Sequence, residues 1–218
     1  MTLRGELRVV DDVAAAFAGL VADESPLSIA LSGGSTAAAA YAAIAGRSPT
    51  PDWSSVDVWW GDERFVPVDD PDSNEGLARR VLLDHLPVRA THSMRGTASD
   101  IEAAARAYDA AVGATPPIQL LHLGLGPDGH TASLFPDSSA LDVTDRLVVA
   151  TGDAFHPQPR LTFTLPAIAR CELVVFTVAG REKAAAFAAV REGHELPAAR
   201  VDAARVIWLV DPAALGSA

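Results

Sequence analysis

The residues with the clearest chemical potential lie in the segment from Gly124 to Pro136, which reads GLGPDGHTASLFP. It follows an apolar run, residues 118–123, that predicts a buried strand, and its glycines turn the chain sharply. The turn places Asp128 and His130 at the carboxyl end of that strand, where open α/β sheets bind ligands. A histidine that titrates near neutral pH, held beside a carboxylate, is typical of general-base catalysis. The alternative is a histidine that only packs or caps the turn.

The same segment also matches the glycine spacing of a dinucleotide-binding loop, with Gly124, Gly126 and Gly129 at the required positions. That motif must open a helix directly after its strand. Here Pro127 interrupts the loop, and Pro136 leaves room for fewer than two helical turns after the last glycine. The sequence therefore argues against dinucleotide binding.

A second glycine loop, Ser32–Thr36 (SGGST), lies between a predicted strand at residues 26–31 and a predicted helix at residues 37–45. Backbone N–H groups of Gly33, Gly34 and Ser35 at a helix N-terminus can bind a phosphate. The loop lacks the lysine of a P-loop. Taken alone, it fits a tight turn with a Ser/Thr cap equally well.

Charged residues follow the next predicted strand, residues 56–60, on the same edge of the sheet. Asp62 and Glu63 stand beside Arg64, so they could hold sugar hydroxyls, orient a base or form surface ion pairs. Further along, Arg160 begins a predicted strand, while Arg181 and Lys183 stand in the first turn of a predicted helix. Cations there oppose the helix dipole, which favours an anion bound nearby; the alternative, above all for Arg181, is a solvated helix start.

Other catalytic chemistries find no support. The chain has no Gly-x-Ser-x-Gly elbow, and its six histidines show no paired metal-ligand spacing. Cys171, the single cysteine, precedes a predicted buried strand and is expected in the core.

The elements that position these loops alternate between strand and helix along the whole chain. We expect strands at residues 7–10, 26–31, 56–60, 118–123, 147–150, 161–164, 172–178 and 206–210. We expect a first helix, capped by Asp11 or Asp12, that ends near residue 22. We expect further helices at residues 37–45, 74–86, 100–112 (with Ser99 as its cap), a short one at Pro166 and one from residue 180, and irregular structure at residues 61–73. Near-continuous apolar strands in this alternation predict an α/β fold, a mostly parallel, Rossmann-like open sheet with helices on both faces. We expect one domain over residues 1–218.

Composition limits the partners. The formal net charge of −11 argues against nucleic acid or an anionic membrane as a partner. There is no apolar signal segment after Met1 and no run of about 18 apolar residues. We therefore expect a cytoplasmic protein, a monomer or weak homo-oligomer, that acts on a small molecule.

Taken in order, five segments resemble the 6-phosphogluconolactonases of the glucosamine-6-phosphate isomerase superfamily. They are residues 31–36 (LSGGST), 60–74 (WGDERFVPVDDPDSN), 124–136, 160–164 (RLTFT) and 180–183 (GREK). The resemblance implies a glucosamine-6-phosphate isomerase-like fold without metal or organic cofactor. It also implies hydrolysis of 6-phospho-D-glucono-1,5-lactone to 6-phospho-D-gluconate in the oxidative pentose phosphate pathway.

The resemblance also suggests roles for residues. His130 would be the general base, and Asp128 would orient its imidazole or a substrate hydroxyl. Arg64 or backbone N–H groups would stabilise the oxyanion. The phosphate would be held by Gly33, Gly34, Ser35, Arg160 and Lys183, and Asp62 and Glu63 would lie near sugar hydroxyls.

Two alternatives remain at this point. The related isomerase/deaminases share these loops, but in them a glutamate that assists ring opening stands five residues after the histidine. This chain has Phe135 there, which cannot relay a proton, so the substitution favours hydrolysis. A catalytically silent sugar-phosphate-binding module is the third possibility. Two departures from the resembled pattern are Ala37 after the glycine loop and the absence of a lysine just before Arg160.

Overall fold

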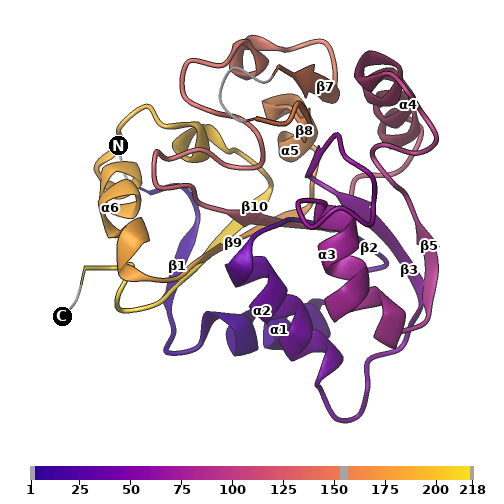
Figure 1. Ribbon diagram of the computed structural model, residues 1–218. Coiled ribbons are helices and arrows are strands. Elements are labelled where there is room, and N and C mark those ends of the chain that lie inside the picture. The colour runs from indigo at the N-terminus through magenta and orange to yellow at the C-terminus, as the bar shows by residue number, and fades with distance from the viewer. Residues whose placement is uncertain (1–2, 153–156, 217–218) are drawn as a thin grey trace.

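A seven-stranded sheet forms the centre of the molecule, of which the computed structural model describes residues 3–152 and 157–216 (Figure 1). Its strands, in spatial order, are β1 (Glu6–Val9), β10 (Arg205–Val210), β9 (Leu173–Val178), β6 (Leu120–Gly124), β2 (Ser28–Leu31), β3 (Trp53–Trp60) and β5 (Val88–Thr91). Every neighbouring pair is parallel. The predicted α/β fold with a mostly parallel sheet is confirmed.

Helices cover both faces of this sheet, as predicted. They are α1 (Val13–Glu24), α2 (Ser35–Ala45), α3 (Asn74–Val81), α4 (Ile101–Gly113), α5 (Leu165–Ala169) and α6 (Ala184–Glu192). Figure 1 shows α1, α2 and α3 together on one side and α4 and α5 on the other. Side-chain alternation along a strand explains the two faces: His122 of β6 stacks on Phe17 of α1, whereas Phe176 of β9 stacks on Trp208, which packs against Phe187 of α6.

Short 3₁₀ turns lie at Leu83–His85, Ser139–Asp142, Arg181–Lys183 and Pro197–Arg200. The first and third of these shorten two predicted helices: α3 ends at Val81, and α6 begins only at Ala184. The predicted cap of α4 was one residue off, because Asp100 rather than Ser99 accepts the N–H of Ala103, at 2.8 Å.

A second, three-stranded antiparallel sheet lies above the large one. It consists of β4 (Asp62–Arg64), β8 (Arg160–Phe163) and β7 (Val148–Thr151). The expectation of irregular structure over residues 61–73 was therefore wrong at its start, because Asp62–Arg64 pairs with β8. Strand β5 had also not been predicted; it is a short edge strand whose side chains remain partly exposed.

The order of the strands creates a crevice. From β2 the chain proceeds to β3 and β5 on one side, whereas from β6 it proceeds to β9 and β10 on the other. The carboxyl ends of β2 and β6 therefore flank the point where the connections diverge, which is where open α/β sheets bind ligands. The loops that follow these two strands are the two glycine loops of the sequence.

Candidate active site

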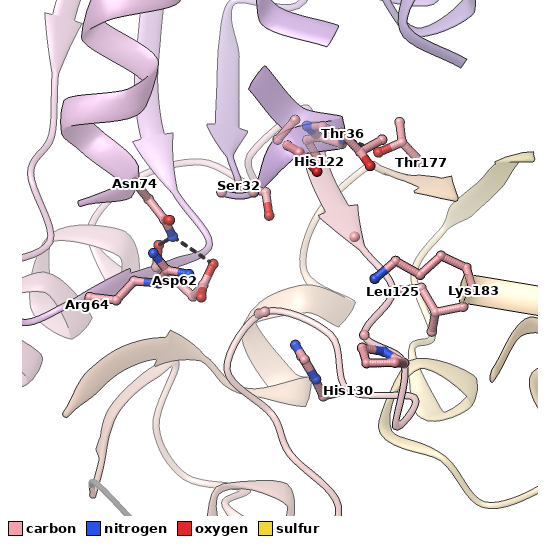
Figure 2. Close-up of a pocket in the computed structure, with 18 of the residues that line it drawn as sticks. Ser32, Thr36, Asp62, Arg64, Asn74, His122, Leu125, His130, Thr177 and Lys183 are labelled. Carbon is pink, nitrogen blue, oxygen red and sulfur yellow. Dashed lines mark hydrogen bonds between the residues drawn. The ribbon is translucent and has the colours of Figure 1, made fainter. Parts of the chain in front are cut away.

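A cavity of about 240 Å³ opens at this switch point (Figure 2). Most of the residues expected from the sequence line it: Gly33, Gly34, Ser35, Asp62, Arg64, His130, Arg160 and Lys183. Loops that are far apart in sequence thus converge on one space. Two expected residues, Glu63 and Asp128, are not among the lining residues of the described chain.

Asp128 acts behind His130 rather than in the cavity wall. Its Oδ1 lies 2.5 Å from His130 Nδ1 and 3.1 Å from the His130 backbone nitrogen. Partial burial raises the pKa of Asp128, but the hydrogen bonds and charge of His130 outweigh it, so the pKa lies below its usual value. An ionised Asp128 accepts a hydrogen from Nδ1, which leaves Nε2 as the basic nitrogen of a neutral ring. In Figure 2 the His130 ring extends into the cavity.

The turn that carries His130 depends on a glycine. Gly126 N–H donates to the His130 carbonyl at 2.8 Å, and Gly129 N–H donates to the Gly126 carbonyl at 3.0 Å. A Cβ at Gly126 would overlap the His130 ring and crowd Asp128 Oδ1. The absence of a side chain there therefore permits the His130–Asp128 contact.

Phe135 packs against the His130 ring. The centroid of the Phe135 ring lies 4.5 Å from that of His130. The guanidinium of Arg160 lies 5.6 Å from the centroid of the Phe135 ring. The buried phenyl ring thus links the proposed base to a cation of the site.

Two arginines lie side by side on neighbouring strands of the small sheet. The antiparallel register of β4 and β8 pairs Arg64 with Arg160. Burial and the charge of Arg64 lower the pKa of Arg160. The Nε atoms of both are buried without a hydrogen-bond partner among the described residues. Arg64 also donates to the Asp72 carbonyl at 2.5 Å. Two adjacent cations in the cavity wall provide a place where negative charge is stabilised.

Asp62 is held by neighbours on both of its oxygens. Ser133 Oγ donates to Oδ2 at 2.8 Å, and Asn74 Nδ2 lies 3.3 Å from Oδ1. Asn74 also packs against the first glycine loop so closely that a Cβ at Gly33 would overlap its amide. The Asp62 carboxylate therefore has a fixed position in the cavity wall beside the glycine loop (Figure 2).

Lys183 provides a third cation, on the opposite side of the cavity from Arg64 (Figure 2). It ends the 3₁₀ turn Arg181–Lys183 and immediately precedes α6. Its neighbour Arg181 is exposed and is not among the lining residues. Of the two cations in this turn, Lys183 lines the cavity and Arg181 does not.

Glu63 was expected near the sugar hydroxyls, but its side chain does not line the cavity. Its side chain is only 3% exposed, and its oxygens accept the N–H groups of Arg64, Asn74 and Glu75, each at 2.7 Å, and the hydroxyl of Ser73 at 3.0 Å. Burial raises the pKa of Glu63 to about 7, against these hydrogen bonds, which lower it. The carboxylate therefore anchors the start of α3 behind the cavity instead of lining it.

Sequence reasoning missed four polar side chains that line the cavity: Asn74, His122, Thr177 and Glu182. Asn74 had been read only as part of a helix start. His122 and Thr177 lie inside apolar strands, and a polar residue within such a run was the available signal. Cys171 is buried as expected, and burial raises its pKa to about 12.

Within residues 3–152 and 157–216, no group of three or more His, Cys, Asp or Glu side chains is arranged to hold a metal ion. No helix in the same ranges has the length and apolar character needed to cross a membrane.

Comparison with known proteins gives a consistent result. The family described as glucosamine-6-phosphate isomerases/6-phosphogluconolactonase matches residues 6–208. The 6-phosphogluconolactonase of Synechocystis is 43% identical over 207 residues, covering 88% of this chain and 84% of that protein. That of Streptomyces coelicolor is 39% identical over 216 residues, covering 88% and 82%.

Solved structures agree. The 6-phosphogluconolactonase of Trypanosoma brucei superposes with a TM-score of 0.85 at 26% identity, covering 99% of both chains. A monomeric glucosamine-6-phosphate deaminase shares the fold, with a TM-score of 0.84 at 20% identity, covering 98% of this chain and 100% of that one. The match over residues 6–208 and the identity to full-length relatives lead to one conclusion: this chain belongs to the glucosamine-6-phosphate isomerase/6-phosphogluconolactonase family.

Proposed function

We propose that this protein hydrolyses 6-phospho-D-glucono-1,5-lactone to 6-phospho-D-gluconate, the lactonase step of the oxidative pentose phosphate pathway. The observation that carries the proposal is the His130–Asp128 pair, 2.5 Å apart, presented to a cavity that also holds three cations. Relatives at 39–43% identity over most of the chain carry the name 6-phosphogluconolactonase.

His130 activates the water. Asp128 accepts the Nδ1 hydrogen, so the Nε2 lone pair takes a proton as the water oxygen attacks the lactone carbonyl. The resulting imidazolium is stabilised by the Asp128 carboxylate. As the carbonyl re-forms, the bond to the ring oxygen breaks, and the imidazolium returns its proton to that oxygen. The product is an open-chain acid with a new hydroxyl group, which ionises at neutral pH.

The arginine pair stabilises the charge that develops on the carbonyl oxygen. Both arginines line the cavity, and burial already desolvates Arg160, so little reorganisation is needed when the oxyanion forms. Arg160 therefore acts with Arg64 in this proposal, rather than with Lys183 at the phosphate.

The first glycine loop and Lys183 hold the phosphate. Ser32 N–H already donates to Tyr41 Oη at 2.6 Å, so the N–H groups that remain for an anion are those of Gly33, Gly34 and Ser35 at the start of α2. Asp62, with its position fixed by Ser133 and Asn74, accepts a hydrogen bond from a sugar hydroxyl. These contacts fix the lactone relative to His130.

Phe135 favours hydrolysis over isomerisation. The position that would carry a proton-relaying glutamate in a deaminase holds a buried ring packed on His130. Lactone hydrolysis requires no ring-opening relay, because water attacks an existing ester carbonyl.

The test is a rate measurement. Glucose-6-phosphate dehydrogenase generates the lactone in situ, and formation of 6-phosphogluconate is followed with and without the protein, after subtraction of spontaneous hydrolysis. We expect a clear acceleration and no turnover of glucosamine 6-phosphate. Folded protein that leaves the lactone at its spontaneous rate but converts glucosamine 6-phosphate would reverse the assignment.

A further inference from the structure

A chain of buried polar side chains lies beneath the first glycine loop. His122 is fully buried in β6, with its Nδ1 2.9 Å from Tyr41 Oη and its Nε2 2.8 Å from Thr177 Oγ1. Its ring stacks on Phe17 at 4.1 Å. Tyr41 in turn accepts the backbone N–H of Ser32 at 2.6 Å. The general-base mechanism uses none of these side chains, yet burying them requires that their hydrogen bonds be satisfied.

The hydrogen bonds between these side chains can be assigned one donor-to-acceptor direction. The Tyr41 hydroxyl has two acceptors in reach, His122 Nδ1 at 2.9 Å and the Ser32 carbonyl at 3.3 Å, and the shorter contact goes to the histidine. Burial lowers the pKa of His122 to about 3, so the ring is neutral and carries a single N–H. With Tyr41 assigned as the donor to Nδ1, the N–H is placed at Nε2, where it donates to Thr177 Oγ1.

Thr177 is left with a hydrogen to donate. Among the described residues, His122 is the one hydrogen-bond partner of its hydroxyl, which already accepts from Nε2. Thr177 lies at the carboxyl end of β9, in register with Gly124, and is only 3% exposed. It lines the cavity together with Ser32, Thr36 and Lys183 (Figure 2). The hydroxyl hydrogen therefore has the cavity as its remaining direction.

We propose that the chain Ser32–Tyr41–His122–Thr177 positions the phosphate end of the site, and that the Thr177 hydroxyl is an additional donor to a substrate phosphate oxygen. The identity of that substrate rests on the proposed function. Tyr41 and His122 are positioning residues, because they act through the Ser32 backbone and through Thr177. These hydrogen bonds also connect β2, β6 and β9 across the switch point, so the glycine loop and Thr177 keep a fixed separation.

Two substitutions at one position test the donor. Thr177→Val keeps the shape and β-branching of the side chain but removes the hydroxyl, while Thr177→Ser keeps the hydroxyl. A hydrogen bond to a charged phosphate corresponds to at least about a tenfold change in affinity. We expect Thr177→Val to raise KM for the lactone and Kd for inorganic phosphate about tenfold, with kcat within about threefold of the parent protein. Thr177→Ser should restore both constants.

Thr91→Val in the edge strand β5 is the matched control for the same exchange away from the cavity, and should change neither constant. If Thr177→Val does not fold, Thr177→Ala, which adds no bulk, takes its place with the same expected result. A double-mutant cycle tests whether His122 acts through Thr177. His122→Leu should raise Kd for phosphate, and combining it with Thr177→Val should add little.

Calorimetry with inorganic phosphate separates this proposal from the proposed function, since it requires no turnover. Thr177→Val that binds phosphate as tightly as the parent protein would overturn the donor role, whether or not the lactone is hydrolysed. A Thr177→Val defect that Thr177→Ser fails to restore would likewise show a structural effect in place of a donated hydrogen bond. Fully additive effects of His122→Leu and Thr177→Val would overturn the claim that His122 acts through Thr177.

Discussion

At the scale of single residues, the site depends on where side chains are absent as well as where they are present. Gly126 has no Cβ, and the space this leaves is occupied by the His130 ring and Asp128 Oδ1. The base and its orienting carboxylate are thus held by the backbone of the turn, which closes through the bond from Gly126 N–H to the His130 carbonyl.

Gly126→Ala tests this dependence. The added methyl group must displace the His130 ring, and a displacement of about 1 Å can cost about 10²-fold in rate. We expect kcat to fall by about that factor, measured in the lactone assay on protein whose circular dichroism matches the parent. Gly19→Ala in α1, where an added Cβ meets nothing within 4 Å, is the control and should keep full activity. A Gly126→Ala enzyme within twofold of the parent kcat would refute the argument.

At the scale of elements, the sequence predicts the strands that are locally evident and misses those defined by a distant partner. Strand β9 is fully buried and apolar except for Thr177, so its pattern alone identifies it. Strand β4 is Asp-Glu-Arg, which has no apolar pattern, and it becomes a strand because β8, about a hundred residues later, pairs with it. The facing arrangement of Arg64 and Arg160 follows from that register and could not be read from either segment.

The same limit explains Glu63. The adjacent carboxylates of Asp62 and Glu63 looked equivalent in sequence, but successive residues of a strand point to opposite faces. Asp62 therefore faces the cavity, while Glu63 faces the start of α3. His130 and the glycine loops were predictable because glycine, proline and histidine leave a strong local signal.

The free energy of unfolding should depend on pH through Glu63, the carboxyl group that anchors the start of α3. Burial raises the pKa of this carboxyl from 4.5 to about 7 in the folded protein, so the folded state binds the proton more tightly than the unfolded chain. The stability this contributes is full below pH 4.5 and is lost as pH rises through about 7. Relative to Glu63→Gln, which cannot titrate, the parent's free energy of unfolding should fall by up to about 1.4 kcal/mol per pH unit between pH 5 and 7.

Denaturant unfolding at pH 5, 6, 7 and 8 measures this difference. Glu172→Gln, at an exposed position, is the control and should show no such slope. A constant difference between the parent and Glu63→Gln across the range would mean that the carboxylate stays ionised on its four donors, and the prediction would be wrong.

At the scale of the whole molecule, an acidic protein carries a local cationic site. The net charge is −11, yet Arg64, Arg160 and Lys183 line one cavity. Lys183 is also the only lysine of the chain. Charge repulsion among these groups costs stability that a bound anion would return, so the folded state should be linked to phosphate-bearing ligands.

We therefore expect 6-phosphogluconate at 100 times its Kd to raise the free energy of unfolding by about 2.7 kcal/mol, measured by denaturant unfolding. Gluconate, which lacks the phosphate, should stabilise far less at the same concentration. Lys183→Ala should lose most of the gain, whereas Arg181→Ala, its exposed neighbour outside the cavity, should keep it. Equal stabilisation by the two ligands would argue against a phosphate subsite.

The central claim, that His130 is the base that activates water for lactone hydrolysis, is tested most directly by one rate. The measurement is kcat for the lactone with His130→Ala, beside His85→Ala as an exposed histidine control. The account predicts that His130→Ala, still folded and still binding 6-phosphogluconate, loses about 10²- to 10⁴-fold in kcat while the control loses nothing. A folded His130→Ala protein that hydrolyses the lactone at the parent rate would contradict the account.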